Sequence, residues 1–202
     1  MTDPLQALLV STGGVALAEV GDKTQLLALA LAARYRRPLP IILGILVATL
    51  ANHALAGWLG AWLSGLLEPG TLRWILGLSF VAVGAWLLVP DRLDGEEPDR
   101  AARTAAGVFA ATLAAFFVVE IGDKTQVATV ILAARYESLL AVVAGTTLGM
   151  MLANVPAVLL GEVAARKLPI RLVHGIAATV FVLVGLAILA GLGSGLVISP
   201  SP

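Results

Sequence analysis

Apolar residues fill six long stretches of this 202-residue chain, and short segments rich in charged residues, proline or glycine separate them. About 20 apolar residues in a helix suffice to cross a bilayer, so each stretch predicts one membrane-spanning helix. The predicted spans cover residues 5–33, 39–66, 71–90, 104–134, 139–164 and 170–192. We therefore expect an all-α integral membrane protein with six transmembrane helices.

The second half of the chain repeats the first at an offset of 101 residues. The segment Glu19–Gln25 returns as Glu120–Gln126 with a single change, Val20 to Ile121. Further pairs at this offset are Gly44 and Gly145, Gly60 and Gly161, Phe80 and Phe181, and Gly84 and Gly185. An odd number of spans per repeat forces the two halves into opposite orientations. We expect inverted three-helix repeats over 1–90 and 104–202, joined by a hydrophilic cytoplasmic linker over 91–103.

Lysine and arginine are distributed unequally between the two ends of the predicted spans. Nine lie at one end, namely Arg34, Arg36, Arg37, Arg92, Arg100, Arg103, Arg166, Lys167 and Arg171, against Arg73 and Arg135 at the other. Because basic residues favour the cytoplasmic side, the first end is predicted to be cytoplasmic and both termini external. The N-terminus has no basic region ahead of the motif, so no signal peptide is expected.

Composition agrees with this class and excludes others. Hydrophobic residues make up 59% of the chain and charged residues 13%, and the mean hydropathy is +0.96. The net charge is zero and no basic face remains, which argues against a nucleic-acid partner. The chain has no cysteine, which excludes disulfides and thiolate metal sites. No nucleophile–base pair or metal-hydrolase signature is present, so we expect neither an enzyme nor a prosthetic group.

The repeated segment places charge inside apolar stretches. The ionisable residues of the two copies are Glu19, Asp22, Lys23, Glu120, Asp123 and Lys124. A charged side chain in a bilayer core costs roughly 2.5–3.5 kcal/mol, so six of them left unpaired would cost on the order of 15 kcal/mol. The charges must therefore compensate one another or serve a function. A buried ion-pair network that only holds helices together is the structural alternative.

Helical spacing predicts where the acids point. Residues three apart share a helix face, so Glu19 and Asp22 should point together, as should Glu120 and Asp123. If the two faces meet, four carboxylates would surround one small volume, with Gln25 and Gln126 one turn further on. Such oxygen ligands suit Ca²⁺, Mn²⁺ and Mg²⁺. We predict that the four acids bind a divalent cation near the membrane midplane.

Other polar residues are candidates for completing the site. Gly21 and Gly122 permit either close helix approach or a local break that offers backbone carbonyls to an ion. Thr24 and Thr125 can supply hydroxyl oxygens or bond back to the helix. Three further residues, Asn52, His53 and Asn154, lie within predicted spans and can either bind the ion or form interhelical hydrogen bonds.

Charge arithmetic suggests what the site would do. Four carboxylates and two lysines leave a net charge of −2, which one divalent cation or two protons would neutralise. Protonation of clustered carboxyl groups in a medium of low dielectric constant can then compete with metal binding, the basis of cation–proton antiport. This arithmetic changes if Lys23 and Lys124 face away from the acids, and the sequence leaves that open.

The duplicated pattern E-x-G-D-K-[ST] in a six-span chain of this length resembles the GDT family of manganese and calcium transporters. The resemblance covers both motifs, the central linker and the three-plus-three layout. It implies exchange of Mn²⁺ or Ca²⁺ for protons, with the motif acids as the ion site. The short linker and the lack of an N-terminal targeting extension resemble bacterial members, which implies the cytoplasmic (inner) membrane.

Our leading hypothesis is a secondary transporter that exports Mn²⁺, and also Ca²⁺, from the cytoplasm in exchange for protons. One alternative is an exporter of a small organic cation such as a basic amino acid, although a site poor in aromatic residues favours an inorganic ion. Another is a passive cation channel without proton coupling. Ion preference, proton stoichiometry, direction and oligomeric state are not determined by the sequence.

Overall fold

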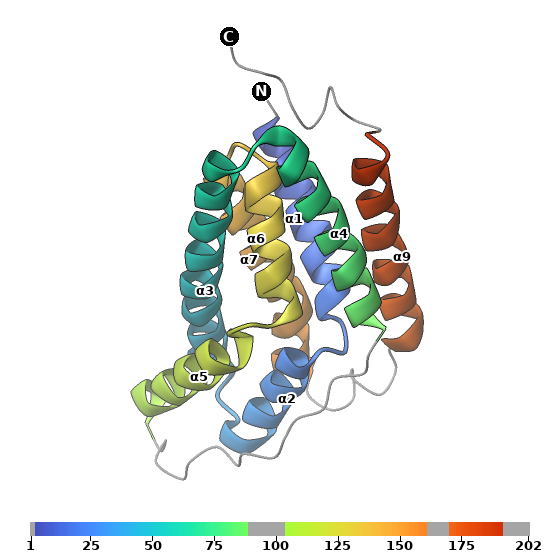
Figure 1. The fold of residues 1–202 in the computed structure, drawn as a ribbon. Helices are drawn as coiled ribbons and strands as arrows, with labels where there is room; N and C mark the ends of the chain where they lie inside the picture. The colour runs from blue at the N-terminus through green and yellow to red at the C-terminus, as the bar shows by residue number, and fades with distance from the viewer. Residues whose placement is uncertain (1–2, 89–103, 161–169, 192–202) are drawn as a thin grey trace.

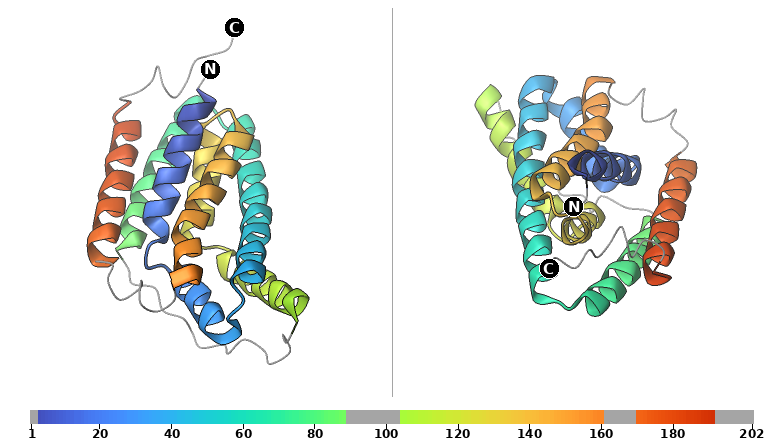
Figure 2. Two further views of the ribbon diagram at one scale, coloured as in Figure 1. Left: turned by 180° about the vertical axis from the view of Figure 1, so that it is seen from behind. Right: turned by 90° about the horizontal axis from the view of Figure 1, so that it is seen from above.

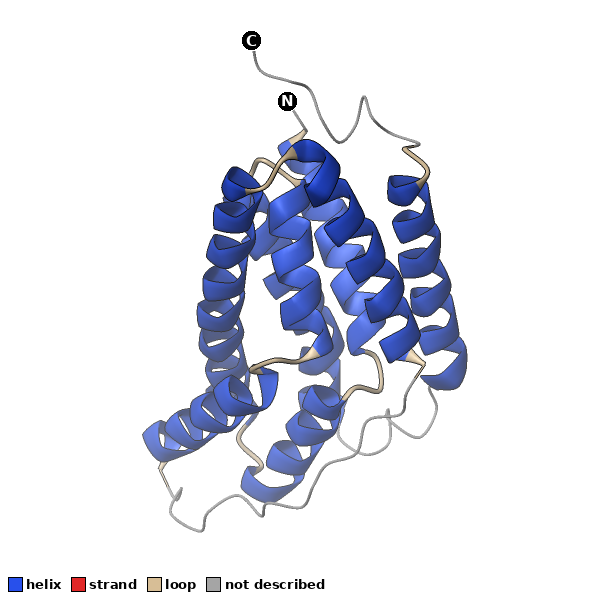
Figure 3. Ribbon diagram, in the orientation of Figure 1, coloured by secondary structure: helices blue, strands red, loops and turns tan. Residues whose placement is uncertain are grey.

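The computed structural model describes residues 3–88, 104–160 and 170–191. Within these ranges the chain forms eight helices and no strand (Figure 3). The helices are α1 (Pro4–Glu19), α2 (Lys23–Tyr35), α3 (Pro38–Leu66), α4 (Pro69–Leu87), α5 (Ala105–Glu120), α6 (Lys124–Arg135), α7 (Leu139–Leu160) and α9 (Ile170–Leu189). The all-helical class is confirmed. The predicted linker over 91–103 and the ends of three predicted spans lie outside the described residues.

Two of the predicted spans are not single helices. The first consists of α1 and α2, which meet at 68°, and the fourth consists of α5 and α6, which meet at 69°. Among the described residues, only the two helices α3 and α7 are individually long and apolar enough to cross a membrane. If each bent pair counts as one span, the number of candidate spans rises to four. In α4 and α9 the apolar segments are shorter, Gly70–Val83 and Ala178–Leu189.

The helices form an upright bundle whose two halves run in opposite directions (Figure 1). In this view α1 and α2 descend, α3 ascends and α4 descends. In the second half α5 and α6 ascend, α7 descends and α9 ascends. Seen from above, α4 and α9 stand together at one side of the bundle (Figure 2). The bends place α2 and α5 at the lower end of the molecule, below α1 and α6.

Equivalent glycines make equivalent contacts between the halves. A Cβ added at Gly145 of α7 would lie 2.8 Å from the Cβ of Ser11 in α1. A Cβ added at Gly44 of α3 would lie 2.8 Å from the Cβ of Thr112 in α5. Ser11 and Thr112 are themselves 101 residues apart. The α1–α7 contact therefore has the same construction as the α3–α5 contact.

The α4–α9 contact joins equivalent residues directly. The rings of Phe80 and Phe181, which the repeat relates, lie with their centroids 5.7 Å apart. Gly77 and Gly185 permit the backbones to approach, because a Cβ at Gly185 would lie 2.7 Å from the carbonyl oxygen of Gly77. Self-pairing of a repeated residue is expected where it lies close to an axis that relates the two halves.

Gly145→Ala should destabilise the protein. Alanine is favoured over glycine inside a helix by about 1 kcal/mol, but here the new Cβ would lie 2.6 Å from the carbonyl oxygen of Leu8. Overpacking of this kind costs about 1–3 kcal/mol, so we expect a lower thermal unfolding temperature for the purified protein in detergent. Gly13→Ala in α1 is the matched control, since nothing lies within 4 Å of its added Cβ. Equal unfolding temperatures for the two variants would contradict the close approach of α1 and α7.

Candidate metal-binding site

Each copy of the motif lies at the break between two helices rather than on one helix. Glu19 is the last residue of α1, and Glu120 is the last residue of α5. Gly21 and Gly122 follow with φ values of +81° and +74°, in the left-handed region that glycine adopts without a steric penalty. The prediction that the acids share the face of a continuous helix is therefore wrong. The local break, the other reading of the two glycines, is confirmed.

The residues after each glycine begin the next helix. Asp22 and Asp123 occupy the N-cap positions of α2 and α6. Gln25 and Gln126 close the breaks, because their Oε1 atoms accept hydrogen bonds from the N–H groups of the motif glycines at 2.7 and 2.6 Å. The amide oxygens that the sequence offered as metal ligands are thus engaged in holding the turns. Aspartate followed three residues later by glutamine is a helix-start signal, so the break was readable from the sequence.

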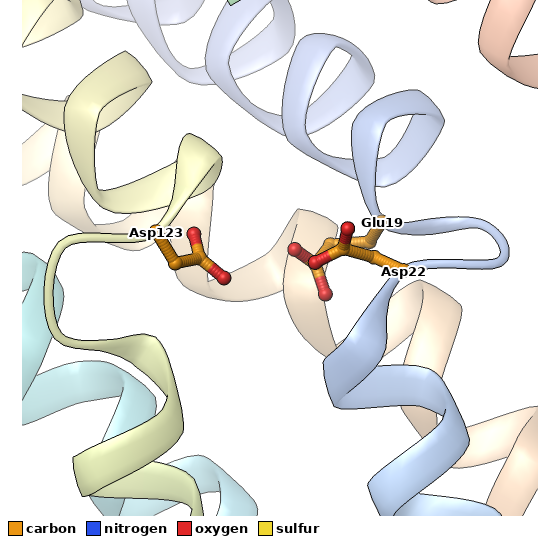
Figure 4. A group of neighbouring side chains, drawn as sticks. All are labelled: Glu19, Asp22 and Asp123. Atoms are coloured by element: carbon orange, nitrogen blue, oxygen red, sulfur yellow. The ribbon is translucent and has the colours of Figure 1, made fainter. Parts of the chain in front are cut away.

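Three of the four motif acids form a buried group. Glu19, Asp22 and Asp123 each offer a carboxylate oxygen, and these oxygens all lie within 4.8 Å of one another. Glu19 and Asp22 lie side by side, and Asp123 faces them from the other half of the chain (Figure 4). All three side chains are buried. This three-acid group is the candidate ion site.

The fourth acid is held by α3. Glu120 accepts hydrogen bonds from the Thr49 hydroxyl at 2.6 Å and from Asn52 Nδ2 at 2.9 Å. Glu120 lies outside the group of carboxylate oxygens within 4.8 Å of one another, and its part in ion binding stays a prediction. For Asn52, hydrogen bonding to a motif carboxylate is confirmed. Thr49 was not predicted, although its position three residues before Asn52 on one helix face was a usable signal.

The two threonines of the motifs bond to different acids in a similar way. Thr24 donates its hydroxyl hydrogen to Oε2 of Glu19. Thr125 donates from its hydroxyl and its backbone N–H to Oδ1 of Asp123, at 2.7 and 2.6 Å. Within the described residues, Glu19 Oε1 and Asp123 Oδ2 are buried and make no hydrogen bond. Two acceptor oxygens inside the site thus remain for a cation to bind, and satisfying buried acceptors is favourable.

Both motif lysines face the acids, and they do so across the two halves. Lys124 Nζ lies 3.5 Å from Asp22 Oδ1, and Lys23 Nζ lies 3.8 Å from Asp123 Oδ2. The Lys124 side chain is 3% exposed and that of Lys23 is 27% exposed. The question that the sequence left open is therefore answered, because both lysines belong to the charge balance of the site.

Asn154 and His53 are buried near the middle of their helices but have no demonstrated role in the site. Asn154 donates its amide to the carbonyl oxygen of Met150 on its own helix at 3.0 Å, and its Oδ1 has no hydrogen-bond partner among the described residues. Both ring nitrogens of His53 are likewise buried without such a partner. Ion ligation by either residue stays a prediction.

Helix ends add partial charges to the three-acid group. The N-termini of α2 and α6 meet the group at their capping aspartates, and an N-terminus stabilises negative charge. The C-terminus of α1 reaches it at Glu19, where the partial negative charge favours a cation. Oxygen ligands without sulfur are those that hard divalent cations prefer. The arrangement can therefore bind such a cation between the carboxylates.

An apolar cavity lies away from the motif residues. It has a volume of about 460 Å³ and is lined by residues of α1, α4, α6 and α9, and apart from Arg135 and Tyr136 its lining is apolar. It contains no motif residue, and it offers too few oxygen ligands for a divalent cation. The three-acid group remains the candidate ion site.

Comparison with known proteins identifies related sequences over both halves. The family model described as "Divalent cation/proton antiporter GDT1" matches residues 7–95 and 108–194. A protein of Vibrio cholerae serotype O1 named "Putative manganese exporter" is 53% identical over 184 residues, which is 91% of this chain and 90% of that protein. No solved structure matches the chain.

Proposed function

The chain belongs to the GDT1 family of divalent cation/proton antiporters, and from this premise we propose that it exports Mn²⁺ from the bacterial cytoplasm in exchange for protons. The family is one of transporters, which agrees with the expected absence of enzymatic activity. Manganese is the ion named for the Vibrio relative. We extend the proposal to Ca²⁺ as a second substrate, because it prefers the same oxygen ligands.

The observation that carries this proposal is the buried three-acid group built from both halves. Glu19, Asp22 and Asp123 bring carboxylate oxygens within 4.8 Å of one another, and a lysine of the opposite half pairs with each aspartate. A divalent cation is small enough to bind oxygens from several carboxylates at once. The same oxygens can instead take up protons, so metal and protons compete for one set of atoms.

The architecture that we propose is a six-span inverted repeat. Its spans are the bent pair α1–α2, α3, α4, the bent pair α5–α6, α7 and α9. Three features support it: the opposite directions of the two halves in Figure 1, the matching contacts of Gly44 and Gly145, and the self-paired Phe80 and Phe181. In transporters with such repeats, discontinuous helices place their ends at the ion site near the midplane.

The orientation that we propose places the lower end of Figure 1 in the cytoplasm. The α2–α3 connection, with Arg36 and Arg37, lies at that end, whereas α6 ends with Arg135 and α4 begins near Arg73 at the opposite end. The positive-inside rule then assigns the central linker to the cytoplasm and both termini to the outside. The membrane is the bacterial inner membrane, as for other exporters that clear the cytoplasm.

Alternating access would follow if the halves exchange conformations. Glu19 lies in the three-acid group, whereas its equivalent Glu120 is bound by Thr49 and Asn52 on α3. We infer that Glu120 enters the ion site when the α5–α6 bend moves, and that Glu19 then leaves it. At the offset of 101 residues, Asn154 is equivalent to His53, which directly follows Asn52. Asn154 would therefore be placed to receive Glu19 in that state.

Reconstitution tests the exchange. The purified protein in liposomes that contain a pH-sensitive dye should admit Mn²⁺ from outside, and the lumen should become more alkaline as protons leave. Ca²⁺ should give the same response, and ionophore-treated liposomes give the zero level for the proton signal.

Three results would contradict the proposal in distinguishable ways. Metal entry without a proton signal would indicate a passive channel. Inhibition of metal entry by lysine or arginine at equal concentration would indicate an organic-cation carrier. Absence of flux for either metal would remove the proposed function altogether.

A further inference from the structure

The two motif lysines form ion pairs that cross between the two halves of the chain, and ion pairing for stability alone does not require this crossing. Each ammonium group pairs with the aspartate of the opposite half, Lys124 with Asp22 and Lys23 with Asp123. The positive charges therefore lie between the same aspartates that would bind a cation from both halves.

Both ion-pair distances exceed those of the shortest charge-assisted hydrogen bonds. Charge-assisted hydrogen bonds between an ammonium group and a carboxylate are about 2.7–2.9 Å long, whereas these pairs measure 3.5 and 3.8 Å. A lysine ammonium is a compact charge on a flexible stem of four carbons, so it can move away by rotation about side-chain bonds. The lysines thus neutralise the aspartates through side chains that are able to move when another cation enters.

The site also contains oxygens that the ammonium groups do not satisfy. Glu19 Oε1 is buried and makes no hydrogen bond among the described residues. Asp123 Oδ2, the atom nearest Lys23, makes none either. A divalent cation in the three-acid group would meet these oxygens and would repel both ammonium groups. Cation and lysine therefore compete for the same aspartates.

From these contacts we propose that Lys23 and Lys124 are resident substitute cations, which neutralise the aspartates of the empty carrier and are displaced when the metal binds. The proposal rests on the proposed function, because it assigns a step of metal exchange to the lysines. They act by position. By neutralising part of the charge of the metal-free site, they favour the return step in which protons replace the metal, since unpaired carboxylates are costly to bury. They also weaken metal binding, which favours release.

The two lysines differ in burial, and this predicts an order of effects. Lys124 is enclosed, whereas more than a quarter of the Lys23 side chain is exposed. A charge close to a cation in a water-poor site interacts with it more strongly than one that water screens. Removing the charge of Lys124 should therefore change metal affinity more than removing that of Lys23.

The test compares metal affinity with transport rate in the full-length protein. Isothermal titration of the purified protein with MnCl₂ should give an affinity about tenfold tighter for Lys124→Met, because one repelling charge is lost. The maximal rate of Mn²⁺ entry into liposomes should fall by a similar factor, because the metal-free carrier returns with its protons more slowly. Lys124→Arg should restore both values to within about threefold of the parent, since the charge is kept.

Further variants separate this mechanism from a structural one. Lys23→Met should shift affinity in the same direction by a smaller factor, and Arg34→Met, which removes an exposed charge at the end of α2, should change neither value. If Lys124→Met does not remain monodisperse on gel filtration, Lys23→Met and Lys124→Arg decide the matter. Parent-like or weaker Mn²⁺ affinity in the methionine variants would overturn the proposal, because a merely structural lysine gives that result. If the parent protein itself neither binds nor moves Mn²⁺, the proposed function fails instead.

Discussion

Asp123→Asn is expected to reduce the initial rate of Mn²⁺ entry into proteoliposomes by about 100-fold, which corresponds to the loss of about 3 kcal/mol of cation binding. Asp123 is buried in the three-acid group and faces Glu19 and Asp22 from the other half of the chain. The substitution removes one of the negative charges that a divalent cation requires. It also removes the partner of Lys23.

The fold should survive this substitution. Oδ1 of Asp123 accepts hydrogen bonds from the N–H groups of Thr125 and Gln126 and so caps α6. Asparagine is as good an N-cap as aspartate and can accept the same bonds. The variant should therefore insert and unfold at a temperature close to that of the parent.

A matched control uses the same substitution at another helix start. Asp3 is the N-cap of α1 and accepts a hydrogen bond from the Leu5 N–H at 2.9 Å, but it is exposed and lies far from the site. Asp3→Asn should leave Mn²⁺ entry unchanged. Transport at parental rates by Asp123→Asn would remove this acid from the ion site.

Glu120→Gln should abolish transport while leaving metal binding nearly intact. This loss of transport without loss of binding is the second large effect that we expect. In the described conformation Glu120 is held by Thr49 and Asn52 outside the three-acid group. Its charge would be needed only when the halves exchange conformations. We expect Mn²⁺ entry to fall by about 100-fold and the Mn²⁺ affinity of the purified protein to change by less than about tenfold.

Glu19→Gln is the comparison that makes this prediction sharp. Glu19 is the equivalent residue of the first half and lies inside the group, so its loss should weaken both Mn²⁺ binding and transport by about 100-fold. Glu68→Gln, an exposed glutamate in the α3–α4 connection, should affect neither. Equal loss of affinity in the Glu19 and Glu120 variants would place Glu120 in the same site in the same state. Normal transport by Glu120→Gln would show that its position on α3 has no part in the cycle.

The crossed ion pairs also place limits on how the halves can be separated. Each half supplies an aspartate and a lysine, and each partner comes from the other half. The site is therefore incomplete in either repeat alone. This dependence explains why both copies of the motif keep the same charged residues, although their present contacts differ.

The residues of the three-acid group could be identified from the sequence, whereas the geometry of the group could not. The repeated acids, glycines and lysines were all identifiable, because charge inside an apolar stretch is conspicuous. The helix break was also readable, since glycine, an N-cap aspartate and glutamine three residues later form a known start signal. The long apolar stretch around the motif instead favoured one continuous helix, and that expectation placed the acids on a shared face.

Sequence by itself determined the helical membrane class, the duplication at a fixed offset and the ionisable residues, because hydropathy and repetition are properties of neighbouring positions. Only the tertiary structure decided that Lys124 meets Asp22, that Thr49 and Asn52 hold Glu120, and that three acids rather than four form the group. These contacts join residues that are 68 to 102 positions apart. Helical spacing fixes which side chains share a face within one helix, whereas contacts between helices depend on the bend at each glycine and on how closely the small residues let the helices pack.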